Sequence, residues 1–246
     1  MEALFLTLND QYTPQILVSN EHFIIVYKPP KMHSAPGKGK SLAEWCYSIY
    51  PEIKDLPRNE NGLLHRLDYE TQGLLLFARN RNSFNDLLEQ QNKGKIIKEY
   101  GAYVSKASKP MPGFPPFYGT FPRDRIDSYF RPFGPGRREV RPLVSLEKGT
   151  VYRTEILNSK LKNTFNTGSL YENTFYIRLR ISLGFRHQIR CHLSWAGFPV
   201  LNDSVYGGQE IGQGVLALRA ENIKFIDPGS GEHLHYSLSP MGLSDL

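Results

Sequence analysis

Two short stretches of this sequence combine acidic, basic and histidine side chains in a way that could support chemistry. The first, residues 65–73, reads His-Arg-Leu-Asp-Tyr-Glu-Thr-Gln-Gly, and the second, residues 184–192, reads Gly-Phe-Arg-His-Gln-Ile-Arg-Cys-His. Asp68 stands at the mouth of an apolar run, where a carboxylate is costly unless it is paired. If Arg190 folds back against Asp68, it keeps that carboxylate ionised in a dry cleft, which is the condition for a carboxylate nucleophile.

The same residue types also have ordinary structural explanations. A single Asp beside an apolar run is more often a cap or a structural salt bridge than a catalytic group. His65, His187 and His192 form no His-Glu-x-x-His spacing, so satisfied structural histidines are more common in this pattern than zinc ligands. Tyr100 reads by default as an ordinary strand aromatic. The residues alone therefore leave both interpretations open.

The elements that must position the first stretch follow from hydrophobic periodicity. Two apolar runs, 16–18 and 23–27, flank Ser-Asn-Glu, which predicts a tight β-hairpin stopped by the Lys-Pro-Pro at 28–30. Residues 73–78 are short and apolar throughout, as expected for a strand covered on both faces. Ser83 is expected to cap a following helix that ends at Gly94. Asp68 should therefore lie in a loop that leads into a buried strand.

The second stretch lies between a predicted strand and a predicted helix. Residues 97–104 read as a strand, and residues 175–183 alternate strictly between apolar and polar side chains, which predicts a half-buried strand. Residues 186–196 then predict a helix with Gly197 at its C-terminal end. Strands outnumber helices without regular alternation, so the fold class is predicted to be α+β.

Residues 105–142 differ in composition from the rest of the chain. They contain eight of the 17 prolines, seven aromatic residues, and eight basic against three acidic side chains. Loops of this length inside a compact domain are usually functional or disordered. The segment is predicted to be a long irregular, basic, proline-rich insertion.

Composition limits the class of protein. The 246 residues are 40% hydrophobic and 22% charged, with a net charge of +6, which are values of a globular protein that favours polyanionic partners. Two cysteines make neither a disulfide framework nor a metal knuckle, and a reducing cytoplasm fits them. No leader peptide and no apolar run long enough to span a bilayer is recognisable. We expect a protein of the cytoplasm with no membrane association.

Four ordered motifs closely resemble the RluA/RsuA superfamily of RNA pseudouridine synthases, in particular its RluA-like branch. The family signature His-Arg-Leu-Asp-x-x-Thr-Ser-Gly-Leu-Leu stands at residues 65–75, and Lys-x-Tyr-x-Ala-x-Val at 98–104. The signature Gly-Arg-[Thr/Ser]-His-Gln-[Ile/Leu]-Arg-x-His stands at 184–192, and Gly-x-Pro-[Ile/Leu]-x-Gly-Asp-x-x-Tyr-Gly at 197–207. The opening hairpin with Lys28-Pro29 is also similar, so the resemblance covers about residues 16–240.

The chain departs from these signatures at several positions. Gln72 replaces a serine, Phe185-Arg186 replaces Arg-Thr, and Asn202 replaces a glycine. Arg219 stands where the family usually has a histidine. None of these changes touches the expected nucleophile.

The resemblance implies a fold and a domain organisation. The expected fold has a central mixed, mainly antiparallel β-sheet flanked by helices and loops, with an active-site cleft across the sheet. Residues 1–246 are expected to form a single catalytic domain without the S4-type RNA-binding domain of many relatives. The 105–142 insertion could substitute for that domain in binding RNA.

The resemblance also implies roles for individual residues. Asp68 would be the nucleophile, Arg190 its salt-bridge partner, and Tyr100 the tyrosine that stacks on the target base. Arg66 would fill the gap left by the extruded nucleotide, and Ile189 would wall the base pocket. Three further residues are expected to bind substrate: His65, Lys98 and Arg186.

The activity implied is isomerisation of specific uridines in ribosomal or transfer RNA to pseudouridine, through a flipped-out base, with no cofactor, metal or protein partner. Uracil leaves C1′, rotates and rejoins through C5, and Asp68 either attacks C1′ or first helps to form a glycal. One alternative is a catalytically silent RNA-binding module of the same fold. Another is a metal-dependent hydrolase that uses His65, Asp68, His187 and His192.

Overall fold

The computed structural model describes residues 2–37, 39–56, 61–119, 121, 124–145, 148–157, 173–242 and 245–246. The chain divides into two compact units. The first unit contains Met1–Glu99, Arg219–Met241 and Asp245, and the second contains Tyr100–Leu218, Gly242–Ser244 and Leu246. The chain passes from one unit to the other inside strands β5 (Ile97–Ser105) and β10 (Leu218–Ile226).

The first unit contains the predicted hairpin and the predicted buried strand. Its strands lie in the order β2 (Gln15–Ser19), β3 (Phe23–Lys28), β4 (Gln72–Ala78), β10, β11 (His233–Leu238) and β1 (Leu4–Leu6). The pairs β2/β3, β3/β4 and β10/β11 are antiparallel, whereas β4/β10 and β1/β11 are parallel. Every residue of β3 and β4 is buried, including the polar Lys28 that ends β3 and the polar Gln72 that begins β4; the rest of both strands is apolar apart from the Tyr27 hydroxyl.

Three helices belong to the first unit: α1 (Leu42–Ile49), the 3₁₀ helix η1 (Pro51–Asp55) and α2 (Arg81–Asn92). A capping box begins α1, because Ser41 and Glu44 each bond the other's backbone N–H. The cap expected at Ser83 is wrong: the Asn80 side chain accepts from the Ser83 N–H and begins α2 three residues earlier. Gly94 follows α2 at φ 66°, which confirms the predicted end.

The second unit has strands in the order β5, β9 (Thr174–Ile181), β8 (Tyr152–Ile156), β6 (Arg125–Phe133) and β7 (Glu139–Leu143). The pairs β9/β8, β8/β6 and β6/β7 are antiparallel. The alternating strand predicted at 175–183 is confirmed as β9, with Ile177, Leu179 and Ile181 buried. The α+β class and the mixed, mainly antiparallel strand pairing are therefore as predicted.

The prediction of an irregular segment over residues 105–142 is wrong for its second half. Strands β6 and β7 form an antiparallel hairpin that pairs Tyr129 with Leu143 and Phe133 with Glu139, joined through η2 (Pro135–Arg137). Pro132 and Pro142 lie within the hairpin. An edge strand tolerates proline, which lacks only the N–H donor, so proline content was a misleading signal here.

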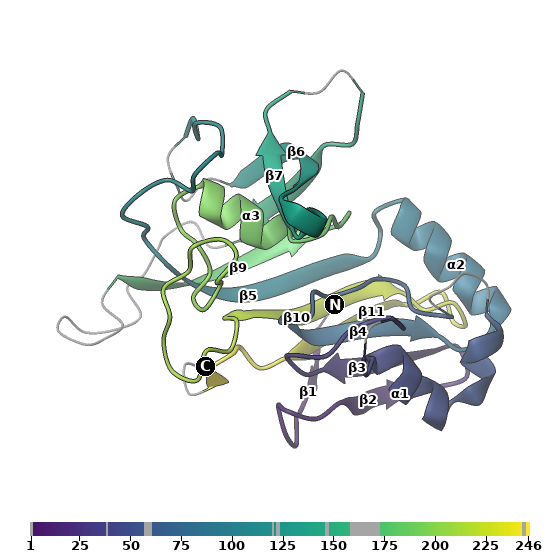
Figure 1. Cartoon of the computed structure of the whole chain (residues 1–246). Helices are drawn as coiled ribbons and strands as arrows, with labels where there is room; N and C mark the ends of the chain where they lie inside the picture. The colour runs from purple at the N-terminus through teal and green to yellow at the C-terminus, as the bar shows by residue number, and fades with distance from the viewer. Residues whose placement is uncertain are drawn as a thin grey trace. The chain divides into compact units, whose positions relative to one another are not determined.

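Helix α3 (Gln188–Trp195) carries the second chemical stretch and contacts β7 and β8 (Figure 1). The helix begins two residues later than predicted, because His187 adopts a left-handed conformation at φ 56° and serves as its N-cap residue. Residues 188–194 are all buried, so α3 is surrounded by protein rather than amphipathic. Cys191 in α3 and Cys46 in α1 are both free and buried.

Candidate functional site

Asp68 lies in a loop whose backbone is fixed at both ends; we call residues 62–71 the Asp68 loop. At its start, the Leu64 N–H donates to Leu76 O at 3.0 Å, and Gly62 O accepts from the Ala78 N–H at 2.8 Å. At its end, the Thr71 N–H donates back to Asp68 O at 3.1 Å. These bonds attach the loop to β4, and the Asp68 residue itself remains half-buried.

A serine outside the loop fixes its centre. The Ser34 hydroxyl donates to Leu67 O at 2.7 Å and accepts from the Leu67 N–H at 3.0 Å. Ser34 is 4% exposed, so both backbone groups of Leu67 depend on this one side chain. The residue directly before Asp68 is therefore held in one position.

Gly73 explains why the loop turns into β4 where it does. Gly73 pairs with Ala220 of β10 and has φ 125°, a conformation that favours glycine. A Cβ atom added at Gly73 would lie 2.3 Å from Ala220 O and 2.5 Å from Ala220 N. The glycine of the first signature is thus required by a close approach of two backbones.

Lys28 is a charged neighbour of Asp68 to which the sequence analysis assigned no role. Its side chain is fully buried, and its Nζ donates to Pro29 O, Met32 O and Tyr69 O at 2.9, 2.8 and 3.2 Å. Burial lowers the pKa of Lys28 to about 7, and the negative charge of Asp68 opposes this shift. The lysine that ends β3 therefore fixes the carbonyl of Tyr69 and places a titratable cation near Asp68.

The other predicted residues of the first unit differ in exposure. Arg66 is exposed, as a side chain that inserts into RNA must be. His65 is buried with no hydrogen-bond partner for either ring nitrogen. Burial, and secondarily the Lys98 charge, holds the pKa of His65 well below its usual range, so its ring is neutral at pH 7. Burial also lowers the pKa of Lys98 to about 8.

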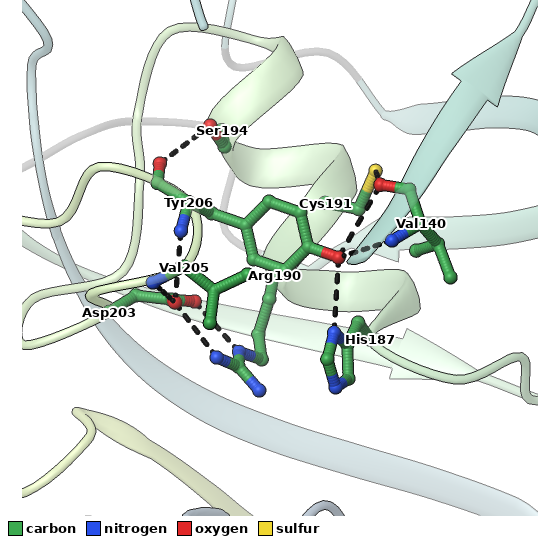
Figure 2. Close-up of polar contacts among 8 residues, drawn as sticks. All are labelled: Val140, His187, Arg190, Cys191, Ser194, Asp203, Val205 and Tyr206. Carbon is green, nitrogen blue, oxygen red and sulfur yellow. Dashed lines mark hydrogen bonds and ion pairs between the residues drawn. The ribbon is translucent and has the colours of Figure 1, made fainter. Parts of the chain in front are cut away.

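In the second unit, Arg190 is held by a carboxylate that the sequence analysis did not single out. Arg190 Nε and Nη2 donate to Asp203 Oδ2 and Oδ1 at 2.7 and 2.8 Å, and the two side chains are 2% and 0% exposed. Asp203 Oδ1 also accepts from the backbone N–H groups of Val205 and Tyr206 at 3.1 and 3.2 Å. Figure 2 shows this bidentate contact between Arg190 and Asp203.

Tyr206 connects the loop that contains Asp203 to α3 and to β7. Its hydroxyl accepts from the Val140 N–H at 3.0 Å and lies 3.1 Å from His187 Nδ1 (Figure 2). Its ring lies over the Arg190 guanidinium, with Cζ 5.5 Å from the ring centroid. The eight residues drawn in Figure 2 are called the Arg190 network: Val140, His187, Arg190, Cys191, Ser194, Asp203, Val205 and Tyr206.

The remaining predicted site residues also lie in the second unit. Tyr100 and Ile189 are 6% and 4% exposed. Arg186 is exposed, and its Nη2 donates to the carbonyls of Arg137 and Glu139, so it anchors the turn of the β6/β7 hairpin. Asp68, Arg66, His65 and Lys98 thus belong to one unit, and Tyr100, Arg186, Ile189 and Arg190 to the other. The pairing of Asp68 with Arg190 stays a prediction.

The departures from the family signatures have structural explanations. Asn202 has φ 62°, which glycine or asparagine adopts readily, and its amide bonds Ile211 N and Val215 O. Gln72 accepts from the Tyr27 hydroxyl at 2.6 Å. Phe185 stacks on Phe130 with ring centroids 5.1 Å apart. Each of these three residues is thus accommodated by contacts within the described part of the chain.

Two features that the described residues lack bear on the remaining alternatives. Among these residues, no group of three or more His, Cys, Asp or Glu side chains is arranged to hold a metal ion. His187 and His192 direct their Nδ1 atoms to different partners, Tyr206 and Thr154. Within the same described ranges, no helix has the length and apolar character needed to cross a membrane.

Comparison with known proteins places these features in one family. Residues 22–195 match the family model described as RNA pseudouridylate synthase. The chain is 26% identical to ribosomal large subunit pseudouridine synthase D of Buchnera aphidicola subsp. Schizaphis graminum, covering 100% of this chain and 76% of that protein. It is 33% identical to an RNA pseudouridine synthase of Chloroflexus aurantiacus over 73% of this chain and 50% of that protein. It is 29% identical to synthase C of Haemophilus influenzae over 92% and 65%.

The fold agrees with the sequence matches. The structure of human RNA pseudouridylate synthase domain containing 1 superposes with a TM-score of 0.65 at 19% identity, covering 96% of this chain and 86% of that one. The chain spans from half to about three quarters of the length of the three sequence relatives named above. The family match, the ordered signatures and this fold agree, and the chain belongs to the RNA pseudouridylate synthase family of isomerases, in its RluA-like branch.

Proposed function

We propose that this chain isomerises uridine to pseudouridine in large-subunit ribosomal RNA, with Asp68 as the nucleophile. The single observation that carries the proposal is the Asp68 loop, which lies inside the family match and holds the backbone of the half-buried Asp68 by hydrogen bonds. The names of the Buchnera and Haemophilus relatives support ribosomal RNA over transfer RNA as the target.

In the proposed mechanism, the target uridine leaves the RNA stack before any bond is broken. Extrusion costs a few kcal/mol and is offset by contacts with the flipped base and by a side chain that fills the gap. Arg66 fills the gap, since it is exposed and its guanidinium is planar and permanently charged. Tyr100 stacks on the base, and Ile189 forms the apolar wall of its pocket.

Chemistry then follows at C1′. Asp68 either attacks C1′ or removes a ribose proton to form a glycal, and uracil departs with the electrons of the glycosidic bond. The base rotates and C5 bonds to C1′ as the C1′–O bond to Asp68 breaks or, on the glycal route, as the removed ribose proton returns. N1 takes up a proton, and the C5 proton is lost to solvent. Arg190 pairs with Asp68 and keeps its carboxylate ionised. His65, Lys98 and Arg186 contribute further contacts to the RNA.

The protein is proposed to act in the cytoplasm without a protein partner. Its net charge of +6 suits a polyanionic substrate, and phosphate contacts would position the RNA without reading its sequence. The two buried free thiols fit a reducing compartment.

The test uses large-subunit ribosomal RNA transcribed with uridine tritiated at C5, because each isomerisation releases that hydrogen. We expect tritium release by the wild-type protein and at least a roughly 10³-fold slower release by Asp68→Asn. RNA binding by the variant should stay within about twofold, because the backbone bonds of the Asp68 loop do not involve its carboxylate. Near-normal turnover by Asp68→Asn would overturn the assignment of the nucleophile.

A second candidate function is a catalytically silent RNA-binding module, motivated by the departures at Gln72, Phe185 and Asn202. It predicts that the wild-type protein binds the RNA and releases no tritium from it. Transfer RNA transcripts labelled in the same way form a parallel arm. Release from transfer RNA alone would keep the activity and overturn the ribosomal target.

A further inference from the structure

Arg190 is held by a carboxylate to which the proposed mechanism gives no part. Asp203 accepts from Nε and Nη2 of Arg190, the two nitrogens on one side of the guanidinium, and from two backbone N–H groups of its own loop. The Asp203 carboxylate therefore has four donors and no exposed surface. Such a contact fixes the plane of the guanidinium as well as its position.

The position of Arg190 within α3 indicates that an arginine is not present there to stabilise the helix. Arg190 is the third residue of α3, and the first turn of that helix contains no acidic side chain. The N-terminal end of a helix is the positive end of its dipole, so a cation there is electrostatically unfavourable. Asp203 offsets this unfavourable charge from outside the helix.

Folding stability in general is also a weak explanation for the pair. A buried ion pair usually adds little stability over apolar side chains of similar volume, because both charges lose their hydration. An ion pair that is 2% and 0% exposed is better explained by the geometry that it imposes. Tyr206 adds to this geometry by lying over the guanidinium from the same loop.

We infer that Asp203 is a positioning residue for uridine isomerisation, which fixes the position and the plane of the Arg190 guanidinium. The inference rests on the proposed function, in which Arg190 is the partner of Asp68. The Asp203 carboxylate touches neither the substrate nor the reacting atoms and acts only through Arg190.

Asp203→Asn is the informative substitution, since the two oxygens of Asp203 have different partners. An amide oxygen at Oδ1 can keep the bonds to Val205, Tyr206 and Arg190 Nη2, whereas an amide NH₂ at Oδ2 faces Arg190 Nε, donor against donor. We expect kcat to fall by about 10²-fold, because small misplacements of a catalytic group have effects of this size. The KM for the tritiated ribosomal RNA transcript should change by less than about threefold.

A loop-directed control separates positioning from loop structure. Ser194→Ala removes the hydrogen bond from Ser194 Oγ to Tyr206 O, 2.8 Å, and leaves Asp203 and Arg190 in contact. It should lower thermal stability slightly and leave kcat within about twofold of the wild-type value. If kcat of Ser194→Ala fell as far as that of Asp203→Asn, the effect would come from the loop structure, and the inference would be overturned.

The double variant tests whether Asp203 acts through Arg190. In an Arg190→Lys background, the guanidinium that Asp203 orients is absent, and adding Asp203→Asn should lower single-turnover rates by no more than about threefold. The same 10²-fold factor in both backgrounds would show an independent, structural role for Asp203.

If Asp203→Asn does not fold, Asp203→Glu tests whether Asp203 positions Arg190. The glutamate keeps the charge and displaces it by one methylene, so kcat should fall below the wild-type value while KM stays unchanged. Wild-type kcat in a folded Asp203→Glu protein would overturn the inference. If the wild-type protein itself released no tritium while binding RNA, the proposed function would fail instead, and the two failures are thereby distinguished.

Discussion

The Asp68 loop and the Arg190 network hold their central side chains in opposite ways. In the Asp68 loop the hydrogen bonds described above hold backbone carbonyls and N–H groups, and the Asp68 residue is half-buried. In the Arg190 network the fixed atoms belong to side chains, and the guanidinium is 2% exposed. Substitution of Asp68 should therefore cost activity more than stability, whereas substitution of Arg190 should cost both.

The largest expected difference in stability is between Arg190→Ala and Asp68→Ala. Arg190→Ala leaves the Asp203 carboxylate buried without its cation, which destabilises a protein by about 3–5 kcal/mol. Asp68→Ala should change the free energy of unfolding by less than about 1 kcal/mol. Urea unfolding followed by circular dichroism measures both. Equal losses of unfolding free energy in the two variants would mean that the Asp68 side chain contributes as much to stability as Arg190. The proposed difference between the Asp68 loop and the Arg190 network would then be wrong.

A smaller effect is expected where the Ser34 side chain holds the backbone of the Asp68 loop at Leu67. Ser34→Ala leaves the buried N–H and C=O of Leu67 without their partner and should cost about 1–3 kcal/mol. The same substitution at Ser48, whose exposed hydroxyl bonds Trp45 O, should cost less than about 0.5 kcal/mol. Urea unfolding of the two variants checks the difference. A Ser34→Ala protein as stable as Ser48→Ala would show that Ser34 does not fix the loop.

The last effect develops gradually with pH and concerns two buried histidines, His65 in the Asp68 loop and His192 in α3. His192 lies between the hydroxyls of Ser128 and Thr154 at 2.9 and 2.8 Å, and burial lowers its pKa to about 3. Between about pH 6.5 and 3, the unfolded chain binds a proton at this residue that the folded protein does not, so stability falls as pH falls. The contribution is about 1.4 kcal/mol per pH unit.

His192→Gln should remove that contribution. We expect the slope of unfolding free energy against pH, measured by urea unfolding between pH 6 and 4, to be smaller than in the wild-type protein by this amount. His65 is also kept neutral by burial and acts in the same direction. An unchanged slope in His192→Gln would contradict the neutral state assigned to His192.

Several strands were predictable from sequence because local patterns encode them, whereas the roles of the site residues stay predictions. The apolar run at 73–78 predicted β4, and the alternation at 175–183 predicted β9. The β6/β7 hairpin was missed because its prolines occur in strands that tolerate them, a property that depends on neighbouring strands. The cap of α2 was misplaced because Asn80 and Ser83 both have capping side chains.

The two charged groups without an assigned role were missed for a different reason. Asp203 stands three residues before Tyr206, a spacing that predicts a turn in which its carboxylate binds nearby N–H groups. Nothing in that spacing indicates that the same carboxylate holds Arg190. Lys28 follows a buried strand, yet its contact with Tyr69 O joins positions distant in sequence. Tertiary contacts of this kind are not encoded in a local motif.

The burial of both cysteines has a practical consequence. Burial raises the pKa of the Cys46 thiol to about 12 and that of Cys191 further still, so neither forms the thiolate that reacts with maleimides near neutral pH. Tyr69 is 47% exposed and directly follows Asp68. A Tyr69→Cys protein would therefore accept a fluorophore at that position alone, and its emission would report the arrival of a nucleic acid at Asp68 in real time, independently of turnover.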